Sequence, residues 1–339
     1  ADPYAFPGAS EVCNGGDDNG DDDVDEGCDD TCDSPEQSGE EQRFTSTSGS
    51  SAKPDLIWSG AGYGLVWQDE RYTDREIFFA PLSASGHRVT SDIRLSTEAG
   101  VSEAPAVAWT GSHYGVVWHD ERDGNSEIYF TVVDPDGTEV GDDVRLTNDA
   151  ALSEYPDIVW TGTEYGVAWE DRRDGNREIY FLRLDPSGNK LTDEIRVTDH
   201  AGESYRPSLA WNGSRFGLAW HDYRDSNYEI YFAALDRNGH EAQVDTRVTV
   251  DTAGSYHPSL VWNTDGWAVA WSDERDGNSE IYVARLQPWG SIMSEARITV
   301  DAGTSTHPSL VWTGHEFGLS WWDDRDGTGE PFFVRLTDS

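Results

Sequence analysis

One short motif recurs along most of the chain and limits the folds that it can adopt. It reads Trp-x-Asp-x-Arg, with a Glu five residues after the Arg, and it occurs six times. Successive copies are 51 residues apart, except for the last step of 50. A fixed period of this length is typical of repeat architectures, in which each unit packs against its neighbours.

Each repeat contains four short runs of β-branched and aromatic residues and no helical pattern. In the third repeat these runs are 156–160, 164–169, 178–181 and 195–198, with Gly, Asn, Asp and Pro between them. Apolar residues nowhere recur with a sustained period of 3.6, so we expect almost no helix. Four antiparallel strands about every 50 residues indicate an all-β, six-bladed β-propeller. Its repeats begin near Pro54, Pro105, Pro156, Pro207, Pro258 and Pro308.

The two ends of the repeat region predict how the ring closes. The last repeat stops after three strands, at residues 337–339. Arg43 lies 51 residues before Arg94, in register with the fourth-run arginines of the later repeats. We therefore predict that a strand around Arg43 completes the last blade and removes an exposed sheet edge. The propeller would then occupy residues 41–339, with four strands in every blade.

The repeated motif residues are interpreted as scaffold, because a residue that every blade needs is usually structural. A four-residue hairpin loop such as 123–126 would place Arg122 directly opposite Glu127 as a cross-strand ion pair. Arginine can bind carboxylates in a rigid, bidentate way. We therefore predict a structural clasp between packed blades. Its members are Asp69, Arg71, Glu76, Asp120, Arg122, Glu127, Asp171, Arg173, Glu178, Asp222, Arg224, Glu229, Asp273, Arg275, Glu280, Asp323, Arg325 and Glu330.

Function is expected where the copies differ. Two variable positions, one between the Trp and the Asp of the motif and one just before each repeat's Pro, should surround one mouth of the central channel. Histidines, aromatic residues and acids at such a mouth suit a sugar, a peptide or a metal; ordinary surface variation is the alternative. The candidate ligand-binding residues are His119, Glu170, His221, Trp322, Tyr155, Arg206, His257 and His307. No catalytic residue is assigned.

Residues 1–40 differ from the repeats. They hold fourteen acids, no Lys or Arg and few apolar side chains, so they cannot build a core of their own. Closely spaced oxygen side chains suit Ca²⁺, although the strict EF-hand pattern is broken by Asp22 and Cys28. We predict a calcium loop, and the alternative is a solvated acidic tail. The predicted ligands are Asp17, Asn19, Asp21, Asp23, Asp25 and Glu26.

The composition narrows the compartment and the partners. The chain has 65 acidic and 24 basic residues, a formal net charge of −41, which argues against nucleic acid and anionic membrane surfaces as partners. An apolar run long enough to span a membrane is also missing. All three cysteines, Cys13, Cys28 and Cys32, precede the repeats, and their odd number leaves one unpaired or intermolecular. We expect a monomer that is secreted, periplasmic or on the cell surface.

Two segments resemble known families. The run Trp-x-Asp-x-Arg-Asp-Gly-Asn-x-Glu-Ile-Tyr, at 118–129 and 271–282, resembles a repeat of large secreted bacterial propellers. Those propellers are similar to the six-bladed periplasmic propeller of the Tol system, which implies a role in protein contacts. Residues 11–33 resemble a cysteine-flanked acidic motif, Cys-Asn-Gly-x-Asp-Asp, of secreted and surface-anchored bacterial proteins, which implies metal binding. The Ser-x-Asp-x-Gly-x-x-Trp boxes of sialidase propellers do not occur here.

Three functions follow as hypotheses. The first is an extracellular calcium-binding module that recognises a glycan or a protein and performs no chemistry. The second is a calcium-dependent hydrolase, lactonase-like or glycosidase-like, in which Glu170, His119 and His221 would converge at the channel mouth. The third is a structural surface protein whose N-terminal segment anchors or spaces the propeller.

Overall fold

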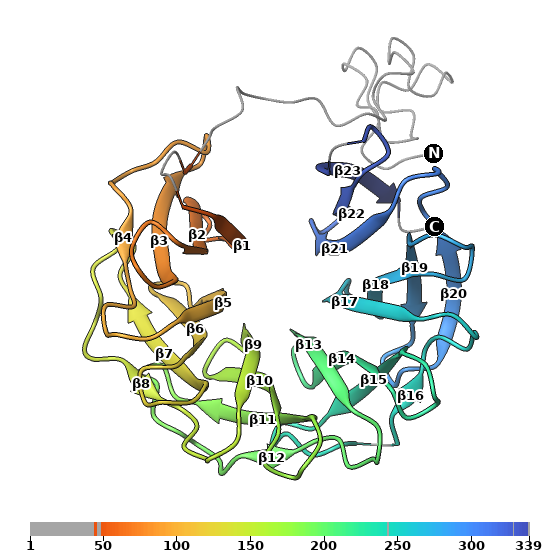
Figure 1. Ribbon diagram of the computed structural model, residues 1–339, viewed down its shortest axis with the longest axis horizontal. Coiled ribbons are helices and arrows are strands. Elements are labelled where there is room, and N and C mark those ends of the chain that lie inside the picture. The colour runs from red at the N-terminus through yellow and green to blue at the C-terminus, as the bar shows by residue number, and fades with distance from the viewer. Residues whose placement is uncertain (1–43, 46–48, 243, 328, 338–339) are drawn as a thin grey trace, which may run out of the picture.

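The chain forms a ring of six antiparallel sheets around a central channel (Figure 1). The computed structural model describes residues 44–45, 49–242, 244–327 and 329–337. All of the regular elements among these residues are strands, so the prediction of an all-β, six-bladed propeller is confirmed. Within each sheet the strands follow one another as a meander, with the first strand on the channel and the last at the rim.

Five blades contain four strands. Blade 1 comprises β1 (Ser51–Trp58), β2 (Gly62–Asp69), β3 (Glu76–Ser83) and β4 (Ile93–Arg94). Blade 2 comprises β5 (Ser102–Trp109), β6 (Tyr114–Asp120), β7 (Glu127–Val133) and β8 (Val144–Arg145). Blade 3 comprises β9 (Ser153–Trp160), β10 (Tyr165–Asp171), β11 (Glu178–Leu184) and β12 (Ile195–Arg196). Blade 4 comprises β13 (Ser204–Trp211), β14 (Phe216–Asp222), β15 (Glu229–Leu235) and β16 (Thr246–Arg247). Blade 5 comprises β17 (Ser255–Trp262), β18 (Trp267–Asp273), β19 (Glu280–Leu286) and β20 (Ile292–Arg297).

Blade 6 has three strands in the described part of the chain: β21 (Ser305–Trp312), β22 (Glu316–Asp323) and β23 (Glu330–Thr337). The predicted fourth strand falls on Arg43, which lies outside the described residues. Phe44, which is described, lies against blade 1, where its carbonyl oxygen accepts a hydrogen bond from Arg88. A cleft of about 900 Å³ separates blade 6 from blade 1 and is lined by Leu56, Val311 and Phe333. Closure of the ring by an N-terminal strand therefore stays a prediction.

The core lies between neighbouring blades. The ring of Tyr165, from the second strand of blade 3, packs edge-on against Phe130 of blade 2 with ring centroids 5.2 Å apart. It also covers Gly115, where an added Cβ would lie 2.6 Å from the Tyr165 ring. Glycine at this position therefore lets an aromatic ring of the next blade lie on the strand backbone. The motif tryptophan of blade 3, Trp169, is fully buried in the same layer.

Each first strand carries an irregularity just before its proline. In β9 the pairing with β10 shifts register between the partners of Ala168 and Glu170, and the residue at the shift, Tyr155, has a φ of +51°. All six blades share this conformation, with φ between +48° and +54° at Lys53, Ala104, Tyr155, Arg206, His257 and His307. A bulge of this kind re-aims a side chain. Here it turns six non-repeated side chains toward the channel.

The predicted outer strand can be tested by charge reversal. In blade 3 the fourth-strand Arg196 binds Glu178 at 2.7 Å. Arg43 and Glu330 occupy the equivalent positions of the repeat, so we expect them to pair when the ring closes. Arg43→Glu should lower the melting temperature by roughly 2–4 °C, because it replaces an attraction of about 1 kcal/mol with a repulsion. The swapped pair, Arg43→Glu with Glu330→Arg, should restore it in a calorimetric scan. An unchanged melting temperature for Arg43→Glu would contradict the pairing.

Candidate functional site

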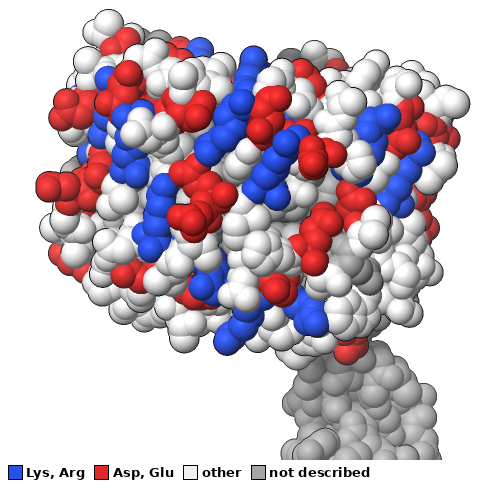
Figure 2. Space-filling view, turned by 90° about the horizontal axis from the view of Figure 1, so that it is seen from below, with Lys and Arg blue, Asp and Glu red and all other residues white. Residues whose placement is uncertain are grey.

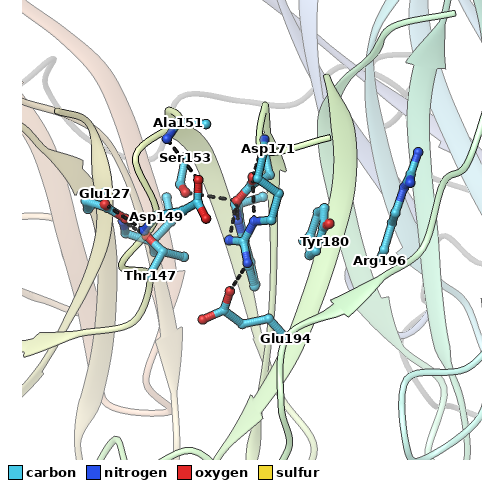
Figure 3. A network of polar contacts seen from close by, with 12 residues as sticks. Glu127, Thr147, Asp149, Ala151, Ser153, Asp171, Tyr180, Glu194 and Arg196 are labelled. Carbon is cyan, nitrogen blue, oxygen red and sulfur yellow. Dashed lines mark hydrogen bonds and ion pairs between the residues drawn. The ribbon is translucent and has the colours of Figure 1, made fainter. Parts of the chain in front are cut away.

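The motif residues form a buried polar network inside each blade. In blade 3, Asp171 is fully buried and accepts hydrogen bonds from Trp169 Nε1 at 2.8 Å and Ser153 Oγ at 2.9 Å (Figure 3). Arg173 donates to the same carboxylate through its backbone N, Nε and Nη2, at 3.0, 2.8 and 2.6 Å. The other edge of the Arg173 guanidinium binds Glu194 (Figure 3). The Asp and Arg of the motif thus bind each other and their neighbours within the blade.

The predicted pairing of the motif Arg with the motif Glu is wrong. Asp120, not Arg122, lies opposite Glu127 in the strand register, so six residues rather than four separate the two strands. The longer loop carries Arg122 out of reach, and it binds Asp120 and Asp143 of its own blade instead. Glu127 binds Arg145 of the fourth strand. The same arrangement recurs in blades 1, 3, 4 and 5, where the set joins the strands of one blade and is not a clasp between blades. In blade 6, Arg325 binds Asp323 and also Asp301, in the segment that follows the fourth strand of blade 5.

Neighbouring blades are joined by the connecting segment that follows each fourth strand. Glu127 of blade 2 accepts a hydrogen bond from the backbone N of Asp149, whose carboxylate accepts one from Ala151 N (Figure 3). Two residues later, Ser153 donates to Asp171 of blade 3. The network therefore runs continuously from one blade to the next.

Three of the candidate ligand-binding residues are buried behind the channel mouth. His119 is 3%, Glu170 is 1% and His221 is 6% exposed. His119 Nδ1 accepts from Tyr155 N at 3.3 Å, and Glu170 Oε1 accepts from Arg206 N at 3.1 Å. His119 and Glu170 therefore hold the bulge of the following blade through its backbone. His221 packs instead against the rings of Tyr256 and His257. Trp322 is half exposed and lines the cleft toward blade 1, which His307 also lines.

The other four candidates do come together. Tyr155, Arg206, His257 and His307 line a recess of about 310 Å³ at the channel mouth, among the six repeated prolines. The Arg206 guanidinium lies 3.7 Å from the centroid of the Tyr155 ring, and the His257 and His307 rings stack with centroids 4.0 Å apart. The bulge in each first strand is what aims these side chains at one another.

Lys53 belongs to this site, and sequence reasoning left it out of the candidate set. Its Nζ lies 4.5 Å from the centroid of the Tyr155 ring, on the channel side of blade 1. The available signal was its rarity, because the chain has only two lysines, Lys53 and Lys190, and Lys53 stands at a position that varies between repeats. We refer to Lys53, Tyr155, Arg206, His257 and His307 as the mouth cluster.

The mouth cluster concentrates positive charge. Burial lowers the pKa of Lys53, and the nearby Arg206 guanidinium lowers it further. Burial, His307 and Arg206 together lower the pKa of His257 to about 3. Burial, Arg206 and Lys53 lower the pKa of His307 as well. The two histidines are therefore neutral at pH 7 beside two cations. On the outer face seen in Figure 2, by contrast, basic side chains alternate with acidic ones.

Two carboxylates, Asp55 and Asp157, line the same recess, each two residues after a member of the mouth cluster. Asp157 Oδ2 accepts from Leu209 N of blade 4 at 2.7 Å, and Asp55 Oδ2 accepts from Val107 N of blade 2 at 2.8 Å. Burial raises the pKa of Asp157 to about 7 and also raises that of Asp55. Both carboxylates bind backbone N–H groups, so they too join neighbouring blades.

The predicted calcium ligands, Asp17 to Glu26, lie outside the described residues. Within residues 44–45, 49–242, 244–327 and 329–337, His, Cys, Asp and Glu side chains nowhere gather in groups of three or more that could hold a metal ion. The same part of the chain has no helix long and apolar enough to cross a membrane.

The sequence matches no protein-family model and no curated protein. Among solved structures, it is similar to TolB from Acinetobacter baumannii, with 19% identity, a TM-score of 0.48, and coverage of 75% of this chain and 58% of that one. It is also similar to a Trypanosoma rangeli sialidase, with 10% identity, a TM-score of 0.55, and coverage of 85% and 55%. A subtype N10 neuraminidase-like protein of A/little yellow-shouldered bat has 8% identity, a TM-score of 0.57, and coverage of 86% and 96%. The chain thus spans just over half of the TolB and sialidase chains. At these identities the likeness shows the β-propeller fold alone.

Proposed function

We propose that this protein is a recognition module that binds a glycan or a protein ligand at the channel mouth, without chemistry of its own. One observation carries the proposal. All six blades give the residue before the proline the same left-handed conformation, yet its side chain differs between most of the blades. A non-glycine residue at positive φ is strained, and such strain is retained at sites where the direction of a side chain matters.

The hydrolase alternative has less support. Its three proposed residues, His119, Glu170 and His221, stand on successive blades and are buried. His119 and Glu170 act as acceptors for backbone N–H groups of the next blade. A general acid or base needs to reach the proton that it transfers. These side chains reach the protein backbone instead.

The proposal is tested by binding and turnover on the same preparation. Fluorescently labelled protein should bind a defined subset of a glycan array or a peptide array, and Tyr155→Ala should abolish that binding. Trp289→Ala, at an exposed tryptophan on the turn between β19 and β20, is the control and should leave it unchanged. Turnover of chromogenic esters or glycosides that disappears in Tyr155→Ala would support the hydrolase instead.

We also propose that the N-terminal acidic segment binds calcium and that the protein works in a calcium-containing compartment, secreted, periplasmic or at the cell surface. Calorimetric titration of the full chain with Ca²⁺ should show binding. The double variant Asp21→Ala and Asp23→Ala should weaken it at least about tenfold, because Ca²⁺ affinity depends on the number of charged ligands. The matched control, Asp136→Ala and Asp142→Ala on the propeller, should not. Equal binding by both variants would contradict a calcium loop at residues 17–26.

A further inference from the structure

The mouth cluster is an exception to the charge pattern of the molecule. The chain carries 65 acidic and 24 basic residues, so most basic side chains have a carboxylate close by. Arg173, for example, binds Asp171 and Glu194, and Lys190 Nζ lies 2.7 Å from Glu194. A basic side chain without such a partner is therefore unusual in this protein.

Among the described residues, two cations at the channel mouth have no carboxylate at hydrogen-bonding distance. Within the described part of the chain, Lys53 has no acidic oxygen within 4 Å, and the nearest to Arg206 is Glu170 Oε1, at 3.9 Å from Nε. The Tyr155 ring contacts both cations and fixes their positions. The two like charges repel each other. Glu103 and Glu170 oppose this effect at Lys53, and an anion between the two cations would relieve the repulsion further.

The neighbouring groups are suited to the same anion. His257 and His307 stand beside the two cations as neutral imidazoles, each able to donate one N–H. His257 Nδ1 is buried and has no hydrogen-bond partner among the described residues. A buried polar atom without a hydrogen-bond partner costs free energy, and a bound ligand that supplies the partner would remove that cost.

We propose that the mouth cluster binds an oxyanion, the carboxylate or phosphate-type group of a ligand, between Lys53, Arg206 and the two histidines. This inference rests on the proposed function, because it specifies the ligand group that enters the same mouth. Arginine and lysine are the side chains that bind such groups most strongly. The formal net charge of −41 repels large polyanions. The ligand is accordingly a small acid, or a largely neutral molecule that presents one or two negative charges.

The test is a titration of the full chain, labelled with isotopes in its nine histidines, by acetate, citrate, phosphate and sulfate. Sodium chloride keeps the ionic strength constant at pH 7. The signals of His257 and His307 should shift and saturate, whereas that of the exposed His240 should not. Saturation by acetate and citrate only would identify a carboxylate site, and saturation by phosphate and sulfate only would identify a phosphate-type site; both support the proposal.

The two lysines provide a matched pair of variants. Lys53→Met and Arg206→Met should each weaken binding about tenfold, the usual loss for one charged hydrogen bond. Lys190→Met, which removes the same charge outside the channel, should leave it unchanged. The proposal is overturned if no anion gives a saturable shift in the unaltered protein, or if Lys190→Met weakens binding as much as Lys53→Met. Array binding that depends on Tyr155 without any anion shift would overturn this inference and leave the proposed function standing.

Discussion

Asp171→Ala should destabilise the propeller by about 3–5 kcal/mol, because it removes one partner of a buried ion pair and leaves the other partner without its acceptor. The carboxylate is fully buried and accepts from Trp169, Ser153 and Arg173, so all three lose a hydrogen bond together. Equilibrium unfolding in guanidinium chloride measures the effect. Asp199→Ala, at a carboxylate that is 85% exposed and pairs with Arg196, should cost less than about 1 kcal/mol. Equal losses would show that the buried network is not structural.

The same network makes stability depend on pH. Burial alone would raise the pKa of Asp171, but hydrogen bonds from Arg173 and Trp169 outweigh it and hold the pKa below its usual range. The depressed pKa means that the carboxylate stabilises the fold fully above the ordinary aspartate value of about 4. That contribution is lost as the pH falls through the lower, folded-state pKa. The difference in unfolding free energy between the unaltered protein and Asp171→Ala should therefore shrink in acid and stay constant near neutrality.

Phe181→Ala should cost about 3–5 kcal/mol, because the ring is fully buried and its removal leaves a cavity between blades 3 and 4. Phe181 packs against Phe216 with ring centroids 4.9 Å apart. Its counterpart in blade 6, Phe333, is 51% exposed in the cleft toward blade 1. By the repeat, Tyr63 of blade 1 is the equivalent partner of Phe333. Alanine substitution at Phe181 and at Phe333 therefore compares the buried interface between blades 3 and 4 with the open interface between blades 6 and 1.

Phe333→Ala distinguishes a closed ring from an open one. If the N-terminal strand closes the ring as predicted, blade 1 should cover Phe333, and its loss should cost at least about 2 kcal/mol in the same unfolding experiment. A cost below about 1 kcal/mol, as for an exposed side chain, would contradict closure. Leu56, Val311 and Phe333 are each about half exposed here, whereas Val107 and Phe181, the counterparts of Leu56 and Phe333, are buried. Exposed apolar surface of this kind favours closure.

The period of the motif was sufficient to predict the blades, because the spacing of strands in a repeat protein leaves few alternatives. The register within a blade was not predictable to the same degree. A hairpin loop two residues longer than expected moved Arg122 from Glu127 to Asp120. Loop length decides which residues face one another across two strands. The turn residues of 121–126 fit either length, so the pairing could not be derived from them.

The sequence was sufficient to find the variable positions near the channel, but not to decide which of them faces it. Variation between copies pointed to two positions in each blade: one lines the recess at the channel mouth, and the other is mostly buried behind it. It could not tell which of the two faces the channel, because this depends on the bulge before each proline. The residue before a proline normally adopts extended backbone, so a φ of +52° at Arg206 could not be expected from the sequence. Lys53 was missed because its place in the site depends on its contact with the Tyr155 ring, two blades away in the sequence.

The hydrogen bonds that hold the bulges have a consequence for how such a protein can be diversified. Tyr155 of blade 3 is held by His119 of blade 2, and Arg206 of blade 4 is held by Glu170 of blade 3. Gln68 and Ser272 support Ala104 and His307 in the same way. The segment that can be exchanged as a functional cassette is therefore not a blade. It begins at the second strand of one blade and ends with the first strand of the next. Grafting a whole blade would therefore separate Tyr155, Arg206 or His307 from the residue that holds its backbone.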